Sequence, residues 1–296
     1  MNFKLAIDSA VTLAETPVWD GRIGRLYWTD LFTGDIHQYD PATGKETGKW
    51  ATGKLIGSAV PCEELGKLLC VVEDGAYILD QATGKMEHLC DAEPGNGANR
   101  YNDSRVDAAG RIFMSTVAKT YGTDDYTPDQ LGGFYMLDTD HKTVKTVVEG
   151  INQYNAIVWN KDNSKMFVVD TYNETLLAFD YDLAKGPISG PKVVVDFKGK
   201  QGMPDGMSID EEDNLYICHW SGKISVWNKK MELAEEIAFP VEQVCCTGFG
   251  GEDMKDLYVA TARYCYGEEE LAKNPGAGGT FVGKAGVKGR PDHFFK

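Results

Sequence analysis

One short pattern recurs six times along the chain at nearly even spacing. In each copy a turn residue and a polar residue precede an apolar run, as in GRLYWTD and KDLYVAT. Apolar runs of this kind, rich in β-branched and aromatic residues, are typical of β-strands. Successive copies begin 42 to 54 residues apart, which predicts one structural unit per copy. The six copies span residues 24–30, 66–72, 110–116, 164–170, 213–219 and 255–261.

A second apolar run follows most copies and predicts a second strand in the same unit. These runs span residues 35–40, 76–80, 133–138, 175–180 and 223–227. The first two lead into DPATGK and DQATGK, which are β-turn patterns with Asp first and Gly near the end. Helical periodicity is nearly absent, and only short stretches such as 267–273 favour a turn or two of helix.

Six units of about 45 residues, each with about four short strands, predict an all-β, six-bladed β-propeller. We expect four-stranded antiparallel blades around a central, metal-containing channel, in one domain over residues 1–296. The N-terminal stretch FKLAIDS is expected to pair with the last blade and close the ring. A two-domain β-sandwich protein is the alternative, but it does not explain the even phase of the six copies. The insertion at 119–133 should form a loop on one face of the disc, where loops often border sites.

Charge and composition argue against several classes of function. A net charge of −15 disfavours nucleic acid as a partner, because an acidic surface repels phosphates. No apolar run approaches the roughly 20 residues that span a bilayer, and the N-terminus lacks the pattern of a signal peptide. We therefore expect no membrane partner and a cytoplasmic location. The seven cysteines show no C-x-x-C spacing and are expected to be buried free thiols.

Common catalytic motifs are missing from the sequence. It contains no G-x-S-x-G nucleophile elbow, no P-loop and no dinucleotide-binding glycine pattern. The five histidines are scattered, and the most site-like of them, His219, is expected to have a packing or surface role.

The repeat allows residues of the innermost strands to be compared between units. The innermost strand should precede each copy by about ten residues, and equivalent positions in a radial repeat converge on the axis. Two carboxylates and two carboxamides recur at this phase, and such oxygen ligands suit Ca²⁺, Mg²⁺ or Mn²⁺ better than a structural zinc site. Each residue alone also fits a turn, a cap or a strand end, but the shared phase favours an axial site. The positions are Glu15, Ser58, Asn102, Asn155, Asp205 and Cys246 or Thr247.

Six blocks of the sequence carry a resemblance to a known family. They are ETPVW (15–19), NRYNDSRVDAAGR (99–111), YNAIVW (154–159), FDYDLAKGPIS (179–189), MPDGMSID (203–210) and CCTGFGG (245–251). In this order they resemble the regucalcin/gluconolactonase family, which includes sugar lactonases and the luciferin-regenerating enzyme of insects. The resemblance runs from about residue 10 to residue 290.

The resemblance implies a six-bladed propeller with one divalent metal ion at the axis, for which Ca, Zn, Mn, Mg and Fe are all candidates. It implies Glu15, Asn155 and Asp205 as the protein ligands of that metal, and Arg100 and Asn102 as substrate-binding residues. Strand alternation also puts Arg100 and Asn102 on one face.

The expected substrate-binding residues differ from those of the animal regucalcins at one place in the sequence. Thr120 is a further expected substrate-binding residue, because Lys119 and Thr120 stand where that branch has two sugar-binding glutamates. The difference leaves the identity of the sugar open.

The chemistry implied is hydrolysis of a gluconolactone-like or pentonolactone substrate to the open aldonic acid. The metal would polarise the lactone carbonyl, and either Asp205 would act as general base or a metal-bound hydroxide would attack. The expected partner is a small sugar lactone, and the chain is expected to be a monomer or weak homo-oligomer. One alternative is a non-enzymatic calcium-binding regulatory protein of the regucalcin type, which Lys119 and Thr120 favour slightly. A pure interaction scaffold is the third interpretation, but it does not explain four oxygen ligands at one phase.

Overall fold

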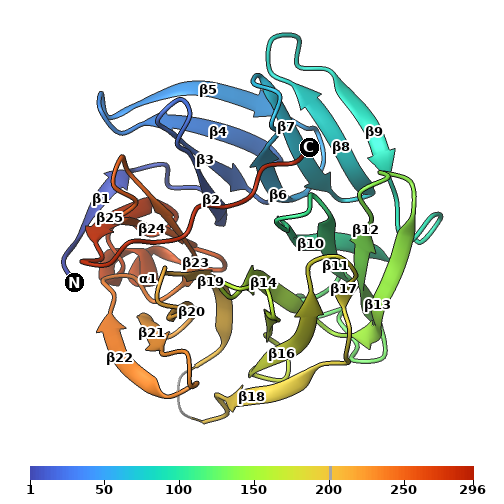
Figure 1. Cartoon of the computed structure of the whole chain (residues 1–296). Helices are drawn as coiled ribbons and strands as arrows, with labels where there is room; N and C mark the ends of the chain where they lie inside the picture. The colour runs from blue at the N-terminus through green and yellow to red at the C-terminus, as the bar shows by residue number, and fades with distance from the viewer. Residues whose placement is uncertain (200–201) are drawn as a thin grey trace.

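Six antiparallel sheets surround a central channel in the computed structural model, which describes residues 1–199 and 202–296 (Figure 1). Blade 1 contains β2 (Ala14–Asp20), β3 (Arg25–Asp30), β4 (Asp35–Asp40) and β5 (Lys45–Ala51). Blade 2 contains β6 (Ile56–Pro61), β7 (Lys67–Val72), β8 (Gly75–Asp80) and β9 (Met86–Cys90). Blade 3 contains β10 (Asn99–Val106), β11 (Ile112–Ala118), β12 (Gly132–Leu137) and β13 (Val144–Ile151).

The second half of the chain repeats this arrangement. Blade 4 contains β14 (Tyr154–Trp159), β15 (Lys165–Asp170), β16 (Thr175–Asp182) and β18 (Lys192–Asp196), with the two-residue β17 (Gly186–Pro187) pairing with the end of β16. Blade 5 contains β19 (Pro204–Ile209), β20 (Leu215–His219), β21 (Lys223–Trp227) and β22 (Leu233–Ala238). Blade 6 contains β23 (Val244–Gly250), β24 (Asp256–Thr261), β25 (Thr280–Lys284) and β1 (Phe3–Ile7).

The strands confirm the repeat and the predicted propeller. The six copies of the pattern form the second strand of each blade, from β3 to β24. The N-terminal strand β1 pairs with β25 in antiparallel register, with Phe3 opposite Gly283, so the first residues close the last blade as predicted. Helix α1 (Glu268–Lys273) lies within the stretch where a short helix was expected.

The core lies between the faces of neighbouring blades. Phe113 of blade 3 contacts Trp159 of blade 4 with ring centroids 5.4 Å apart, and Tyr216 of blade 5 contacts Phe249 of blade 6 at 5.2 Å. A blade therefore buries both faces, which explains why the second strands are buried at nearly every position. Six cysteines are buried as predicted, whereas Cys265 is exposed.

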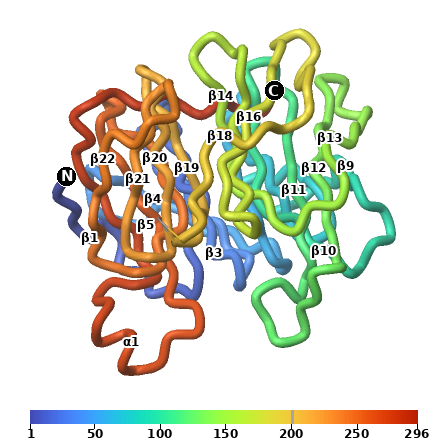
Figure 2. The backbone as a smooth tube through the Cα atoms, turned by 90° about the horizontal axis from the view of Figure 1, so that it is seen from below, coloured from blue at the N-terminus to red at the C-terminus, as the bar shows by residue number. Residues whose placement is uncertain are grey.

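The two faces of the disc differ in what projects from them. In Figure 2, the segment around α1 and the insertion after β11 project on the same side, and the C-terminal segment runs along the opposite side. The insertion is a loop as predicted, although its last two residues already belong to β12. No helix among the described residues is long and apolar enough to span a bilayer.

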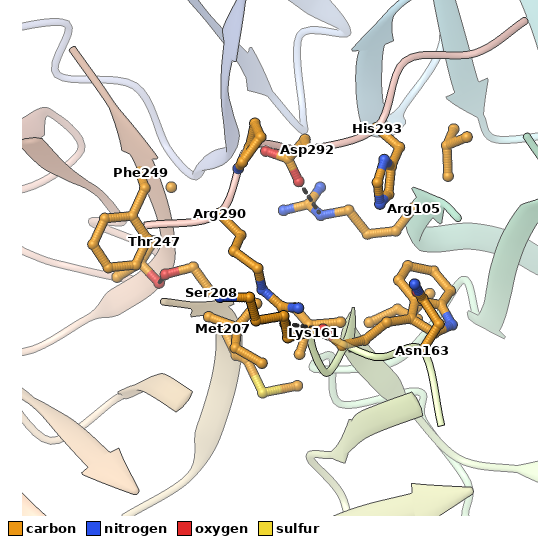
Figure 3. Close-up of a pocket in the computed structure, with 17 residues that line it drawn as sticks. Arg105, Lys161, Asn163, Met207, Ser208, Thr247, Phe249, Arg290, Asp292 and His293 are labelled. Carbon is orange, nitrogen blue, oxygen red and sulfur yellow. Dashed lines mark hydrogen bonds and ion pairs between the residues drawn. The ribbon is translucent and has the colours of Figure 1, made fainter. Parts of the chain in front are cut away.

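The C-terminal segment crosses the channel on its own side of the disc. The backbone N–H of Arg290 donates to the carbonyl of Ile209 in blade 5 at 3.1 Å, and that of Phe295 donates to Pro61 in blade 2 at 3.1 Å. Below it, Arg105 Nε lies 3.5 Å from a carboxylate oxygen of Asp292, and the two side chains face each other in a cavity of about 190 Å³ (Figure 3). The segment thus ties opposite parts of the ring together.

His219 at the end of β20 is fully buried, which agrees with a packing role. Its Nδ1–H donates to the carbonyl of Gly202 at 3.1 Å, and its Nε2 lies 2.7 Å from the Ser225 hydroxyl. Burial lowers the pKa of His219 from 6.5 to about 4. The neutral ring therefore stabilises the fold above pH 6.5, and this contribution is lost as the pH falls toward about 4.

We expect the free energy of unfolding to fall by about 3 kcal/mol more between pH 6.5 and 4 in the wild type than in His219→Gln. Urea titrations at several pH values measure this difference. The matched control is His88→Gln, which makes the same substitution at an exposed histidine in β9. Equal slopes for the wild type and His219→Gln would contradict the prediction.

Candidate metal and substrate site

In all six blades the innermost strand pairs irregularly with the second strand, and the irregularity lies at equivalent points near the start of the innermost strand. At each point the innermost strand contains one more residue than its partner, which is a β-bulge, and bulges re-aim side chains. The register shifts lie between Glu15 and Val18, Ile56 and Ser58, Tyr101 and Ser104, Asn155 and Ile157, Pro204 and Met207, and Val244 and Cys246.

The bulges define which residues are equivalent around the ring. In each blade we take the residue that follows the partner of the last residue of the repeat copy. Glu15 follows Ala14, which pairs with Asp30, and Cys245 follows Val244, which pairs with Thr261. The six positions are Glu15, Gly57, Asn102, Asn155, Asp205 and Cys245.

The sequence count was therefore wrong by at least one residue in blades 2 and 6. It gave Ser58 instead of Gly57, and Cys246 or Thr247 instead of Cys245. A fixed offset fails because the turn between the first two strands varies in length, from three residues between Asp107 and Arg111 to five between Gly250 and Asp256. Ser58 instead hydrogen-bonds the Ser104 hydroxyl in the neighbouring blade.

Five of the predicted site residues line one cavity of about 430 Å³ on the face that carries the insertion. They are Glu15, Arg100, Asn102, Asn155 and Asp205. The alternation argument for Arg100 and Asn102 agrees with this, since Arg100 Nη1 donates to Asn102 Oδ1 at 3.0 Å.

Lys119 and Thr120, which stand where two sugar-binding glutamates were expected from the resemblance, lie in different surroundings. Lys119 lines the cavity and forms an ion pair with Glu73 at 2.5 Å. Thr120 is absent from the residues that line the cavity, and its hydroxyl donates to Gln130 Oε1 at 2.9 Å. The structure thus places Lys119, rather than Thr120, beside the other site residues.

Two carboxylates of the cavity wall lie close to the buried thiol of Cys245. A carboxylate oxygen of Glu15, one of Asp205 and the Sγ atom of Cys245 all lie within 4.8 Å of one another. Burial, followed by the charges of Asp205 and Asp103, raises the pKa of Glu15. Burial and the charge of Asp103 likewise raise the pKa of Asp205. A cation between these groups would relieve both effects.

A chain of hydrogen bonds orients the two amide side chains. Asn102 Nδ2 donates to Asn155 Oδ1 at 2.5 Å, and Asn155 Nδ2 donates to the Thr171 hydroxyl at 2.8 Å. Arg100 completes the chain through its bond to Asn102. Burial lowers the pKa of Arg100 to about 10, so its guanidinium stays charged at neutral pH. These hydrogen bonds fix the orientation of both amides, so that the Asn102 nitrogen faces the Asn155 oxygen.

Trp220 is a site residue that the sequence alone did not indicate. Its indole Nε1–H donates to Asp205 Oδ2 at 2.7 Å and fixes the rotation of that carboxylate. The bond also lowers the pKa of Asp205, against the larger effect of burial. Trp220 directly follows His219, so the end of β20 was the available signal.

Replacing Trp220 with Phe should weaken metal binding about 10- to 100-fold, because a side chain that orients a metal ligand has effects of this size. Calorimetric titration of the metal-free protein measures the change. Trp50→Phe is the matched control, since the indole N–H of Trp50 also donates, at 2.8 Å, but to the Gln81 carbonyl and outside the cavity. Unchanged affinity in Trp220→Phe would contradict the assigned role.

Aromatic side chains surround the mouth of the cavity. Tyr121 and Tyr126 of the insertion have ring centroids 5.0 Å apart, and Phe32 stacks on Tyr264 at 5.5 Å. The Tyr264 hydroxyl donates to the carbonyl of Gly122 at 3.4 Å and so joins the loop after β24 to the insertion. Three loops thus contribute aromatic side chains to the cavity: the β3–β4 loop, the insertion and the loop after β24.

The chain is similar to several known proteins over nearly its whole length. A family model described as SMP-30/Gluconolactonase/LRE-like region matches residues 13–263. Regucalcin of Danio rerio is 30% identical over 288 residues, covering 96% of this chain and 94% of that protein. A pentonolactonase of Haloferax volcanii is 29% identical over 300 residues, covering 99% and 97% of the two chains.

A solved structure has the same fold. The crystal structure of the calcium-binding protein regucalcin from Agrobacterium tumefaciens matches with a TM-score of 0.91 and 24% identity, over 100% of this chain and 97% of that one. With the family model covering most of its length, the chain belongs to the SMP-30/gluconolactonase/LRE-like family.

Proposed function

We propose that this protein is a metal-dependent lactonase that opens small sugar lactones to aldonic acids. The observation that carries the proposal is the convergence of Glu15, Asn155 and Asp205 in one cavity with Arg100 and Asn102. The cavity volume of about 430 Å³ suits a small polar ligand. Membership in a family of sugar lactonases supports the same reaction.

The residues present fit a divalent cation. The carboxylates of half-buried Glu15 and buried Asp205 lie close together, and their raised pKa values express the cost of charging both without a cation. The oriented amide of Asn155 supplies a third oxygen donor. When bound by these residues, a divalent ion acts as a Lewis acid on the lactone carbonyl.

Arg100 and Asn102 are the groups that we assign to substrate binding. Both lie in the cavity wall, and their mutual hydrogen bond holds the guanidinium and the amide at fixed positions. A guanidinium offers several N–H donors in one plane, which suits the ring and hydroxyl oxygens of a sugar lactone. These donors would orient the ring so that its carbonyl carbon faces Asp205.

Asp205 is our candidate general base. Its carboxylate would accept a proton from the water that attacks the carbonyl carbon, and would return it to the ring oxygen when the carbon–oxygen bond breaks. The Trp220 N–H holds the carboxylate in a fixed rotation during both transfers. The product is the open aldonic acid.

The test is an assay of gluconolactone and several pentonolactones with protein treated with EDTA, before and after divalent metals are restored. We expect hydrolysis to be lost on metal removal and recovered on metal addition. Hydrolysis that EDTA does not affect, or no hydrolysis of any lactone, would overturn the proposal. Calcium binding without turnover would instead favour a non-enzymatic regulatory protein of the regucalcin type.

A further inference from the structure

We propose that the thiolate of Cys245 is an additional ligand of the metal site, and that it makes the site prefer zinc-like ions to calcium. The inference rests on the metal centre of the proposed function and concerns which ion that centre selects. It does not depend on which lactone is the substrate.

The position of Cys245 in the ring is the first observation. Cys245 is the equivalent, in blade 6, of Glu15 in blade 1 and Asp205 in blade 5, because all three lie at the bulge of the innermost strand. Blade 6 stands between blades 5 and 1 in the closed ring (Figure 1). The fold thus places the thiol between the two carboxylates.

The distances are the second observation. The Sγ atom and the two carboxylate oxygens lie within 4.8 Å of one another. Zinc binds sulfur at about 2.3 Å and oxygen at about 2.0 to 2.2 Å, so ligand atoms on one tetrahedral ion are roughly 3.5 Å apart. Small side-chain rotations would bring the three atoms onto a common ion.

The neighbouring thiol is held differently, although both cysteines are buried. Cys245 Sγ donates a long, weak hydrogen bond to the Gln243 carbonyl at 3.7 Å, whereas Cys246 Sγ donates to the Thr247 carbonyl at 3.7 Å. Only Cys245 belongs, with Glu15 and Asp205, to a group of ligand atoms among the described residues. Cys246 is therefore a matched control.

Ligand softness predicts the preference among metals. Calcium and magnesium take oxygen ligands, whereas thiolate sulfur favours zinc and related ions. On binding, the sulfur–metal bond forms and the thiol proton leaves to solvent. Three anionic ligands on a divalent ion leave one excess negative charge, which the Arg100 guanidinium in the same cavity offsets.

The experiment is a titration of the metal-free protein with Co²⁺, followed by competition with Zn²⁺ and Ca²⁺. A cobalt–thiolate bond gives an intense charge-transfer band in the near ultraviolet, which oxygen ligands do not give. We expect this band in the wild type and in Cys246→Ser, and its loss in Cys245→Ser. The affinity for Zn²⁺ relative to Ca²⁺ should fall at least about 10-fold in Cys245→Ser. Far-ultraviolet circular dichroism checks that each variant is folded.

The outcomes separate this inference from the proposed function. Cobalt binding without the band in the wild type, or a band that persists in Cys245→Ser, would overturn the role of Cys245 and leave the oxygen-ligated metal centre in place. Absence of binding of all three ions to the wild type would overturn both. A wild type that prefers Ca²⁺ to Zn²⁺ would overturn the predicted selectivity.

Discussion

Asp205→Asn is expected to lower lactone hydrolysis by about 10³-fold or more while leaving the protein folded. The substitution keeps the size of the side chain but removes a general base, whose contribution is typically about 10² to 10⁴-fold, and a metal ligand. The fold should survive, because a neutral amide beside Glu15 removes the repulsion between two neighbouring carboxylates. Steady-state assays and thermal unfolding in EDTA measure the two effects.

Asp40→Asn is the matched control for this variant. Asp40 is also buried, but it lies at the end of β4, where it accepts the backbone N–H of Ala42 at 2.9 Å and pairs with Arg25. It should retain the wild-type rate. Near-normal hydrolysis by folded Asp205→Asn would show that Asp205 is not the base, and an unfolded variant would contradict the expected stability.

Gly57→Ala is expected to destabilise the protein by about 3 kcal/mol and to reduce activity. Gly57 occupies the ligand position of blade 2, and a Cβ atom there would overlap the carbonyl oxygen of Asn102 in blade 3. Strands β6 and β10 must move apart to remove this overlap. Overpacking of this kind costs about 1 to 3 kcal/mol of stability, occasionally more. The shift would also break the bond from Asn102 to Asn155.

Urea unfolding and lactonase assays test this variant against Gly97→Ala. Gly97 lies in a loop where an added Cβ has no neighbour within 4 Å and the backbone is not left-handed. Its replacement should change neither stability nor rate. A stable and active Gly57→Ala protein would mean that the inner strands can move apart without cost, contrary to the close contact between β6 and β10.

Much of the fold could be predicted because its signals are local. A strand such as β3 has turn residues before it and an apolar run from Leu26 to Trp28, and these properties are read from a few neighbouring positions. The closing pair of β1 and β25 was also predictable, since a six-unit ring needs a partner for its last strand. Arg100 and Asn102 were placed together correctly because they are two residues apart on one strand.

The remaining site residues depend on pairing and ring closure. Five residues separate Gly250 from Asp256 at the turn of blade 6, whereas four separate Asp20 from Arg25 in blade 1, so a count of nine or ten selected Cys246 or Thr247 where the structure has Cys245. The bond from Trp220 to Asp205 joins the ends of two paired strands, and no sequence spacing expresses it. The position of Lys119 in the cavity wall, with Thr120 turned to Gln130, likewise follows from the path of the insertion.

By itself the sequence determined the number of blades, the strands within them and four of the oxygen-bearing side chains on the axis. These follow from two-residue alternation, turn chemistry and an even repeat, which act over short stretches of chain. The tertiary structure decided that Gly57 and Cys245 occupy the other two ligand positions, and that a thiol lies between Glu15 and Asp205. Those positions depend on the length of each inner turn, on how the strands pair and on how the ring closes. Pairing and ring closure bring together residues far apart in the chain.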